Sequence, residues 1–318
     1  MRPLIIIRKI PSIDFMGLHK LGFIFSGLLT AASIVLFLTM GLNYGIDFSG
    51  GIIIEARTQG PADLAAMRAK LDSLGIGEIS LQGFGSPDDV LIRVPRQPGD
   101  GKAQEAAVAK VKDSLGSNID YRRTEVVGPK VGGELVFKGI LATIAALVAI
   151  AIYVWFRFKW QFGVGAMLST LHDTITTIGL FSLLQIEFNL TTLAAILTIA
   201  GYSINDTVVI YDRVRETMRK YKTMDFRELI NKSLNETLSR TILTVSTTAL
   251  AVLSLLIFGG QVLRGFSIAM LWGIVIGTYS SLFIAAPLLY YVRPKEMRPT
   301  KPVLPVGVPA PGAQTGAP

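Results

Sequence analysis

An apolar stretch that is long enough to cross a lipid bilayer carries an acidic residue in its interior and ends in alternating charges. The stretch is Leu193–Arg215, and it holds Asp206 together with Ser203, Asn205 and Thr207. Placing a carboxylate inside such a segment costs about 2.5–3.5 kcal/mol on insertion scales, so the residue needs a partner, a water-filled path or a proton. The pattern predicts a titrating carboxylate in a transporter. The alternative is an acid that caps a broken helix or stays wet near the membrane interface.

Other polar groups sit in neighbouring apolar segments. His172 and Asp173 lie within one, and Arg240 stands at the start of another. Helical spacing puts Arg240 on one face of its helix together with three hydroxyl groups, those of Thr244, Thr247 and Thr248. Such threonines can also be packing contacts that bond carbonyls of their own helix. If the polar faces converge, they form a hydrated channel for a cation.

A proton is the ion that this set of residues favours. Burial disfavours the charged form of a carboxylate, and a nearby Arg favours it. A contact between Asp206 and Arg240 that opens and closes would therefore switch proton affinity between two conformations. A sodium ion could use the same carboxylate with hydroxyls and carbonyls, so both ions stay open.

Composition limits the class of protein. Half of the 318 residues are hydrophobic (50%) and only 17% are charged, which is typical of a membrane protein. With no cysteine and only two histidines, disulfides, thiolate metal sites and a histidine-rich metal centre are excluded. We expect no cofactor and, because no nucleophile–base pair is visible, no enzyme. The net charge of +8 comes mostly from Lys and Arg beside the apolar segments, which indicates anionic lipid rather than nucleic acid.

Six apolar segments predict six transmembrane helices, at residues 21–42, 139–156, 162–184, 190–211, 241–258 and 265–291. Basic residues flank them mainly on one side, which predicts that both termini are cytoplasmic and that residues 43–138 lie outside. The predicted parts are a cytoplasmic segment at 1–20, one span at 21–42, the outer domain at 43–138, a five-helix bundle at 139–292 and a disordered tail at 293–318. An amphipathic segment at 212–240 should contain a helix at 224–240, lying on the membrane surface or, alternatively, docking a partner.

The outer segment, 43–138, reads as a small α+β domain. Strand patterns at 51–58, 78–83, 90–95 and 119–127 alternate with helical patterns at 62–75 and 102–115. The order βαββαβ is that of a ferredoxin-like domain. Its half-covered antiparallel sheet fits a binding or docking surface, and it holds no catalytic constellation.

Six short motifs carry a resemblance to a known family. They are IDFMG at 13–17, YGIDFSGG at 44–51, VGPKVGGEL at 127–135, LHD at 171–173, GYSINDTVVIYDRVRE at 201–216 and NETLSRTILTVSTT at 235–248. In this order around six spans, they resemble the SecF branch of the SecD/SecF family, in the resistance-nodulation-division superfamily. The resemblance implies a subunit of the bacterial Sec translocase in the inner membrane that pairs with SecD and uses the proton-motive force in late steps of preprotein export.

The resemblance also implies roles for single residues. Asp206 would carry protons, Arg240 would regulate it, and His172 and Asp173 match a third-span motif. Further implied partners are the Sec translocon channel, unfolded preproteins and a membrane insertase. Two alternatives remain: half of a small-molecule exporter of the same superfamily, and a structural or insertase subunit without ion coupling.

Overall fold

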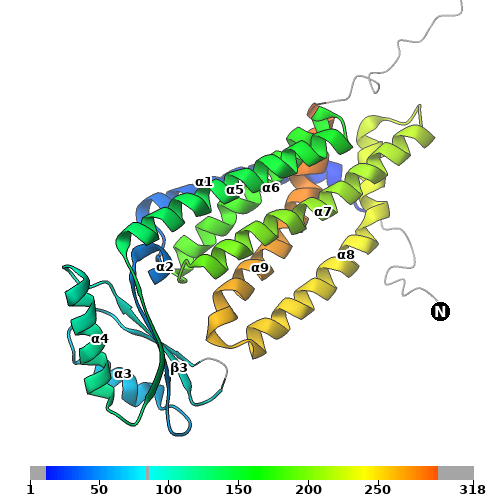
Figure 1. Cartoon of the computed structure of the whole chain (residues 1–318). Coiled ribbons are helices and arrows are strands. Elements are labelled where there is room, and N and C mark those ends of the chain that lie inside the picture. The colour runs from blue at the N-terminus through cyan, green and yellow to red at the C-terminus, as the bar shows by residue number, and fades with distance from the viewer. Residues whose placement is uncertain (1–11, 84–85, 293–318) are drawn as a thin grey trace, which may run out of the picture.

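The structure, a computed structural model, describes residues 12–83 and 86–292. Long helices form a bundle, and a small sheet domain stands at one end of it (Figure 1). The bundle contains α1 (Phe15–Met40), α5 (Pro129–Arg157), α6 (Trp160–Leu184), α7 (Leu190–Lys220), α8 (Phe226–Phe258), α9 (Gly260–Ser280), a π-helical turn (Ser281–Ala285) and α10 (Ala286–Tyr291).

Five helical stretches of the described chain are long and apolar enough to cross a membrane: Phe15–Met40, Val131–Arg157, Leu190–Lys220, Phe226–Phe258 and Val262–Tyr291. The remaining predicted span, at 162–184, corresponds to α6, which carries His172 and Asp173 and packs inside the bundle against α1, α5, α7 and α9. The prediction of an all-helical membrane part is confirmed for five helices. A membrane crossing by α6 stays a prediction.

The outside of the bundle is apolar. Phe156 is 90% exposed and Phe258 85% exposed, and α5 buries very little of its length against the rest of the chain. Contiguous apolar surface of this extent marks contact with lipid or with another protein. The chain is a multi-pass membrane protein.

The amphipathic helix expected at 224–240 is present as the first part of a longer helix. One unbroken helix, α8, runs from Phe226 to Phe258, because no Gly or Pro interrupts the chain where the amphipathic part meets the apolar part. The apolar face of its first half is buried against protein rather than lipid: Leu229, Ile230 and Leu234 join a core with α1, α7 and α10. This face therefore holds the bundle together.

The helices α7 and α9 approach each other closely. A Cβ atom added at Gly277 would lie 2.9 Å from Cβ of Ser203, and one added at Gly273 would collide with Ile199. Small residues four apart let two membrane helices come near enough for their polar groups to meet. The helix that begins with α9 widens into the π-helical turn just beyond Gly277, before Pro287.

The small domain is an antiparallel sheet with helices on one face. Its elements run β1 (Gly51–Arg57), α3 (Leu64–Asp72), β2 (Ser80–Gly83), β3 (Asp89–Pro95), α4 (Gly101–Leu115) and β4 (Asp120–Val127), after a short α2 (Ile46–Ser49). The four strands lie in the order β2-β3-β1-β4, and every neighbouring pair is antiparallel. Alternate residues of β1 and β3, such as Ile52, Ile54 and Ile92, face α3 and α4 and form the core.

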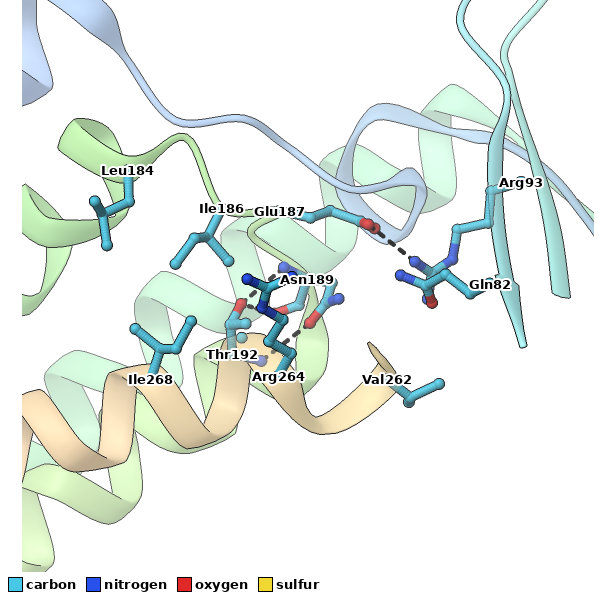
Figure 2. Close-up of a pocket in the computed structure, with 11 residues that line it drawn as sticks. Gln82, Arg93, Leu184, Ile186, Glu187, Asn189, Thr192, Val262, Arg264 and Ile268 are labelled. Atoms are coloured by element: carbon cyan, nitrogen blue, oxygen red, sulfur yellow. Dashed lines mark hydrogen bonds and ion pairs between the residues drawn. The ribbon is translucent and has the colours of Figure 1, made fainter. Parts of the chain in front are cut away.

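The sheet domain is tied to the loop between α6 and α7. Arg93 of β3 makes an ion pair of 2.9 Å with Glu187 of that loop, and the Gly45 amide donates to the Phe188 carbonyl. Figure 2 shows the Arg93–Glu187 pair at the rim of a hollow of about 390 Å³ between the two parts. Arg264, at the start of α9, borders the same hollow.

Candidate functional site

Asp173 on α6 is the centre of a buried hydrogen-bond network. Its side chain is 1% exposed. Ser203 of α7 donates to its Oδ2 at 2.6 Å, and Ser280 of α9 donates to the same oxygen at 2.8 Å. Because these donors come from different helices, the carboxyl group joins α6, α7 and α9 at one point.

His172 completes the other side of this carboxyl group. Its Nδ1 lies 3.0 Å from Oδ1 of Asp173, and its ring stands 6.4 Å from the ring of Tyr279. The remaining ring nitrogen, Nε2, is buried and has no hydrogen-bond partner within the described residues. The His172–Asp173 pair is therefore a buried polar joint that leaves one ring nitrogen without a partner among the described residues.

Asp206 is also buried, yet its surroundings differ. It is 4% exposed, and its Oδ2 has no hydrogen-bond partner among the residues that the structure describes. Arg240 of α8 is the cation whose charge acts on it. In the described chain no hydrogen bond and no ion pair of 4.0 Å or less joins the two side chains. An orphaned acid beside a nearby cation is the arrangement that a gain or loss of a proton would alter most.

The buried face of α7 connects these groups. Ser203 and Asp206 are one turn apart on it, and Thr207 shares a hydrogen bond of 2.7 Å with Ser281 of the π-helical turn. One turn further, the Tyr211 hydroxyl donates to the Ala285 carbonyl at 3.2 Å. The α7 helix is thus fastened along its length to α6 and to the π-helical turn. π-Helical turns of this kind are frequent at functional sites.

Not all residues of the predicted channel join this site. Asn205 lies on the exposed side of α7, and Arg240 and Thr247 are exposed on α8. Three hydroxyl groups of α8 each donate to a carbonyl of their own helix. They belong to Thr244, Thr247 and Thr248. For these three threonines the structure shows the packing role that their spacing also allowed.

Sequence reasoning missed the contribution of α9. Ser280 donates to Asp173 and also pairs with Ser169 at 2.8 Å, and Ser281 pairs with Thr207. The available signal was the run Thr278–Ser281, four hydroxyl side chains in succession inside an apolar span. Within residues 12–83 and 86–292, no group of three or more His, Cys, Asp or Glu side chains is placed to hold a metal ion.

Comparison with known proteins identifies the family. The model of the family "Protein export membrane protein SecD/SecF, C-terminal" matches residues 107–295, and that of the "SecD/SecF GG Motif" matches residues 35–62. The chain belongs to the SecD/SecF family. The first match contains Asp173, Asp206 and Arg240, so the buried network lies in the part of the chain that defines the family.

Curated relatives within the SecD/SecF family are similar over most of their length. The protein translocase subunit SecF of Rickettsia rickettsii (strain Sheila Smith) is 47% identical over 280 residues, which cover 87% of this chain and 90% of the relative. The subunit of the same name from Cereibacter sphaeroides is 46% identical over 299 residues, covering 91% of this chain and 92% of that one.

The solved structure of SecDF from Thermus thermophilus, a translocon-associated membrane protein, has the same fold over this region. The TM-score is 0.72 at 35% sequence identity, and the alignment covers 89% of this chain. SecDF in its super-membrane-facing form gives a TM-score of 0.69 at the same identity. The chain spans 39% of the length of the SecDF chain in both cases.

Proposed function

We propose that this chain is the SecF-type subunit of a bacterial Sec preprotein translocase, and that proton movement through its membrane bundle assists late steps of export. The observation that carries the proposal is the buried Asp206, whose Oδ2 has no hydrogen-bond partner among the described residues while Arg240 acts on it through its charge. A carboxyl group in this position changes its interactions with the bundle whenever its proton is gained or lost. Family membership supplies the biological setting.

Each residue of the site has a role in this proposal. Asp206 takes up and releases the proton, and Arg240 adjusts its affinity as α8 shifts against α7. His172 and Asp173 hold α6, α7 and α9 together, so that a change at Asp206 is transmitted to the whole bundle. A membrane potential contributes about 2.3 kcal/mol per charge per 100 mV, enough for a few protons to bias a two-state rearrangement.

The proposal requires a partner and an orientation. This bundle holds few buried charges, and the chain spans 39% of the SecDF chain, which supports a second, SecD-type half that encloses the path. In our proposal α6 also crosses the membrane, which makes six spans in all, both termini are cytoplasmic in the inner membrane, and the sheet domain is a ferredoxin-like domain on the outer side. There it would meet preprotein emerging from the translocon channel. The subunit itself catalyses no covalent reaction.

The test compares two Asp→Asn variants on α7 in membrane vesicles that carry the translocase with its partner. Release of preprotein is measured with the proton gradient intact and collapsed. Wild type should slow when the gradient collapses, and Asp206→Asn should be slow in both conditions. The matched control is Asp212→Asn, six residues further along α7 in an exposed ion pair with Arg157. Gradient-dependent release that persists in Asp206→Asn would rule out proton coupling through this acid.

A structural role without ion coupling is the second candidate, because Asp173 shows how an intramembrane acid can serve as a joint. Its carboxyl group is bound by Ser203, Ser280 and His172 at once. If Asp206 had the same role, Asp206→Asn would export normally but unfold more easily in detergent. A sodium-coupled mechanism would respond to a sodium gradient instead of a proton gradient in the vesicle assay.

A further inference from the structure

A hollow of about 490 Å³ opens at the end of the bundle that lies away from the sheet domain, between the end of α5 and the last turns of α7. Its walls are almost entirely charged. They are formed by Arg157, Asp212, Arg215, Glu216, Arg219 and Lys220.

The positive charges in this hollow exceed the negative ones, and the two carboxylates are already paired. Asp212 is bound by Arg157 at 2.9 Å and lies 3.8 Å from Arg215. Glu216 is engaged by Arg213, outside the hollow, at 2.6 Å. Arg219 and Lys220 have no acidic partner among the described residues. The hollow therefore has uncompensated positive charge to offer to an anion.

Two of the cations are held in place by an aromatic ring. The guanidinium groups of Arg157 and Arg215 lie 4.9 and 5.3 Å from the ring centroid of Phe158, which is buried. Arg215 also donates to the Arg157 carbonyl at 3.4 Å. Cation–π contacts restrict the guanidinium groups before any ligand arrives. The wall of the hollow is thus partly preorganised.

The aromatic residues beside the hollow indicate its depth in the membrane. Trp155 is 66% exposed and Trp160 55% exposed, on either side of the turn that carries Arg157. Exposed Trp side chains at the ends of membrane helices lie at the level of the lipid headgroups. The hollow therefore opens where phospholipid phosphates are found, next to the lipid-facing side of α5.

We propose that this hollow binds the headgroup of an anionic phospholipid. The phosphate would lie between Arg219 and Lys220 and the Arg157–Arg215 wall, with the acyl chains along the exposed apolar surface of α5. Basic pockets of this kind at the ends of membrane helices recognise anionic headgroups. A zwitterionic lipid carries the same phosphate with a compensating cation, so the uncompensated charge of the hollow selects a net anionic lipid.

The test uses tryptophan fluorescence as a local reporter. The chain, purified with its SecD-type partner where one binds, carries Trp272→Phe so that Trp155 and Trp160 are its only tryptophans. It is reconstituted in phosphatidylcholine vesicles that contain a small fraction of brominated phosphatidylglycerol or of brominated phosphatidylcholine. We expect brominated phosphatidylglycerol to quench the tryptophan fluorescence more strongly than brominated phosphatidylcholine, as if its local concentration were about fivefold higher for each uncompensated cation. Added salt should weaken this preference.

Two double variants separate this site from general surface charge. Arg219→Gln with Lys220→Gln should abolish the preference for phosphatidylglycerol. The control, Lys20→Gln with Lys222→Gln, removes the same charge from exposed positions that do not line the hollow and should leave the preference intact. Equal quenching by the two brominated lipids, equal losses in both variants, or loss of the preference when the protein partner binds would each overturn the proposal. This assay reports lipid rather than export, so its outcome is independent of proton coupling.

Discussion

Ser203 of α7 donates a hydrogen bond of 2.6 Å to Asp173 of α6, one helical turn away from Asp206. Asp206, which we propose to titrate, and Asp173, which is hydrogen-bonded on both carboxylate oxygens, are therefore linked through the Ser203 side chain. A rotation of α7 that changes the surroundings of Asp206 must also stretch or break the bond to Asp173. Making and breaking this bond would give the bundle two discrete arrangements, which is what a coupled rearrangement requires.

The first prediction concerns Ser203→Ala. Asp173 would lose one of its donors in a buried setting, which costs roughly 1–3 kcal/mol. We expect a lower unfolding temperature in detergent and weaker gradient dependence of export. The control is Thr198→Ala on the same helix, since this exposed hydroxyl only bonds the Ala194 carbonyl. Equal effects of the two substitutions would show that the link to Asp173 has no special weight.

The second prediction concerns Gly277→Val. A Cβ at this position would lie 2.9 Å from Cβ of Ser203, so the branched side chain must push α7 away from α9. Overpacking of this kind costs roughly 1–3 kcal/mol. We expect thermal unfolding at lower temperature, together with loss of the export function.

The matched control for Gly277→Val is Gly201→Val, because a Cβ added at Gly201 meets no atom within 4 Å. The two variants make the same change of residue in neighbouring membrane helices, so helix propensity cancels between them. Unchanged stability of Gly277→Val would mean that the contact between α7 and α9 relaxes without loss.

The third prediction concerns Arg240→Met. Arg240 is exposed on α8 and is not part of a packed core, so its loss should leave the fold intact. Export should nevertheless be impaired, because the cation that acts on Asp206 is gone. Export and the amount of protein in the membrane are measured together, with Lys222→Met as the control for charge. Disappearance of Arg240→Met from the membrane would indicate a structural role instead.

The sequence predicted the polar residues better than their connections. Asp173, Asp206 and Ser203 are conspicuous because charge and hydroxyl groups are rare in apolar spans, and all three are buried in the structure. Ser280 went unnoticed, since a run of hydroxyl side chains in an apolar helix gives no sign of which neighbour each of them meets. That information depends on how α9 packs against α6 and α7, and a single sequence contains no such distances.

The same limit applies to the first half of α8. The helical spacing of Leu229, Ile230 and Leu234 correctly indicates an apolar face, but periodicity does not distinguish lipid from protein as the partner of that face. The sheet domain was easier, because Gly and Pro mark its turns and its strands alternate. There the local pattern and the tertiary structure agree.

The fourth prediction concerns the ion pair between the sheet domain and the bundle. Arg93 and Glu187 are 2.9 Å apart, and their side chains are 14% and 27% exposed. A double-mutant cycle with Arg93→Gln and Glu187→Gln should give a coupling energy of up to about 1 kcal/mol. The measurement is hydrogen exchange of the β3 amides in the full chain. A coupling energy of zero would show that the ion pair adds nothing to the other contacts between the two parts, such as the backbone bond from Gly45 to Phe188.

The last prediction concerns acid stability of the sheet domain. Arg57 donates to both carboxylate oxygens of Asp89, at 2.7 and 2.8 Å, and this bonding holds the pKa of Asp89 below its usual value. Because the folded pKa is the lower one, the pair stabilises the domain above the unfolded pKa, near 3.9, and the stabilisation is lost as pH falls through the folded pKa. Hydrogen exchange of β1 and β3, corrected for intrinsic rates, should show protection falling below about pH 4. Asp89→Asn should remove this pH dependence, whereas Asp63→Asn, a helix cap of α3, should retain it. Protection that falls equally with pH in Asp89→Asn would assign the acid sensitivity to other carboxylates.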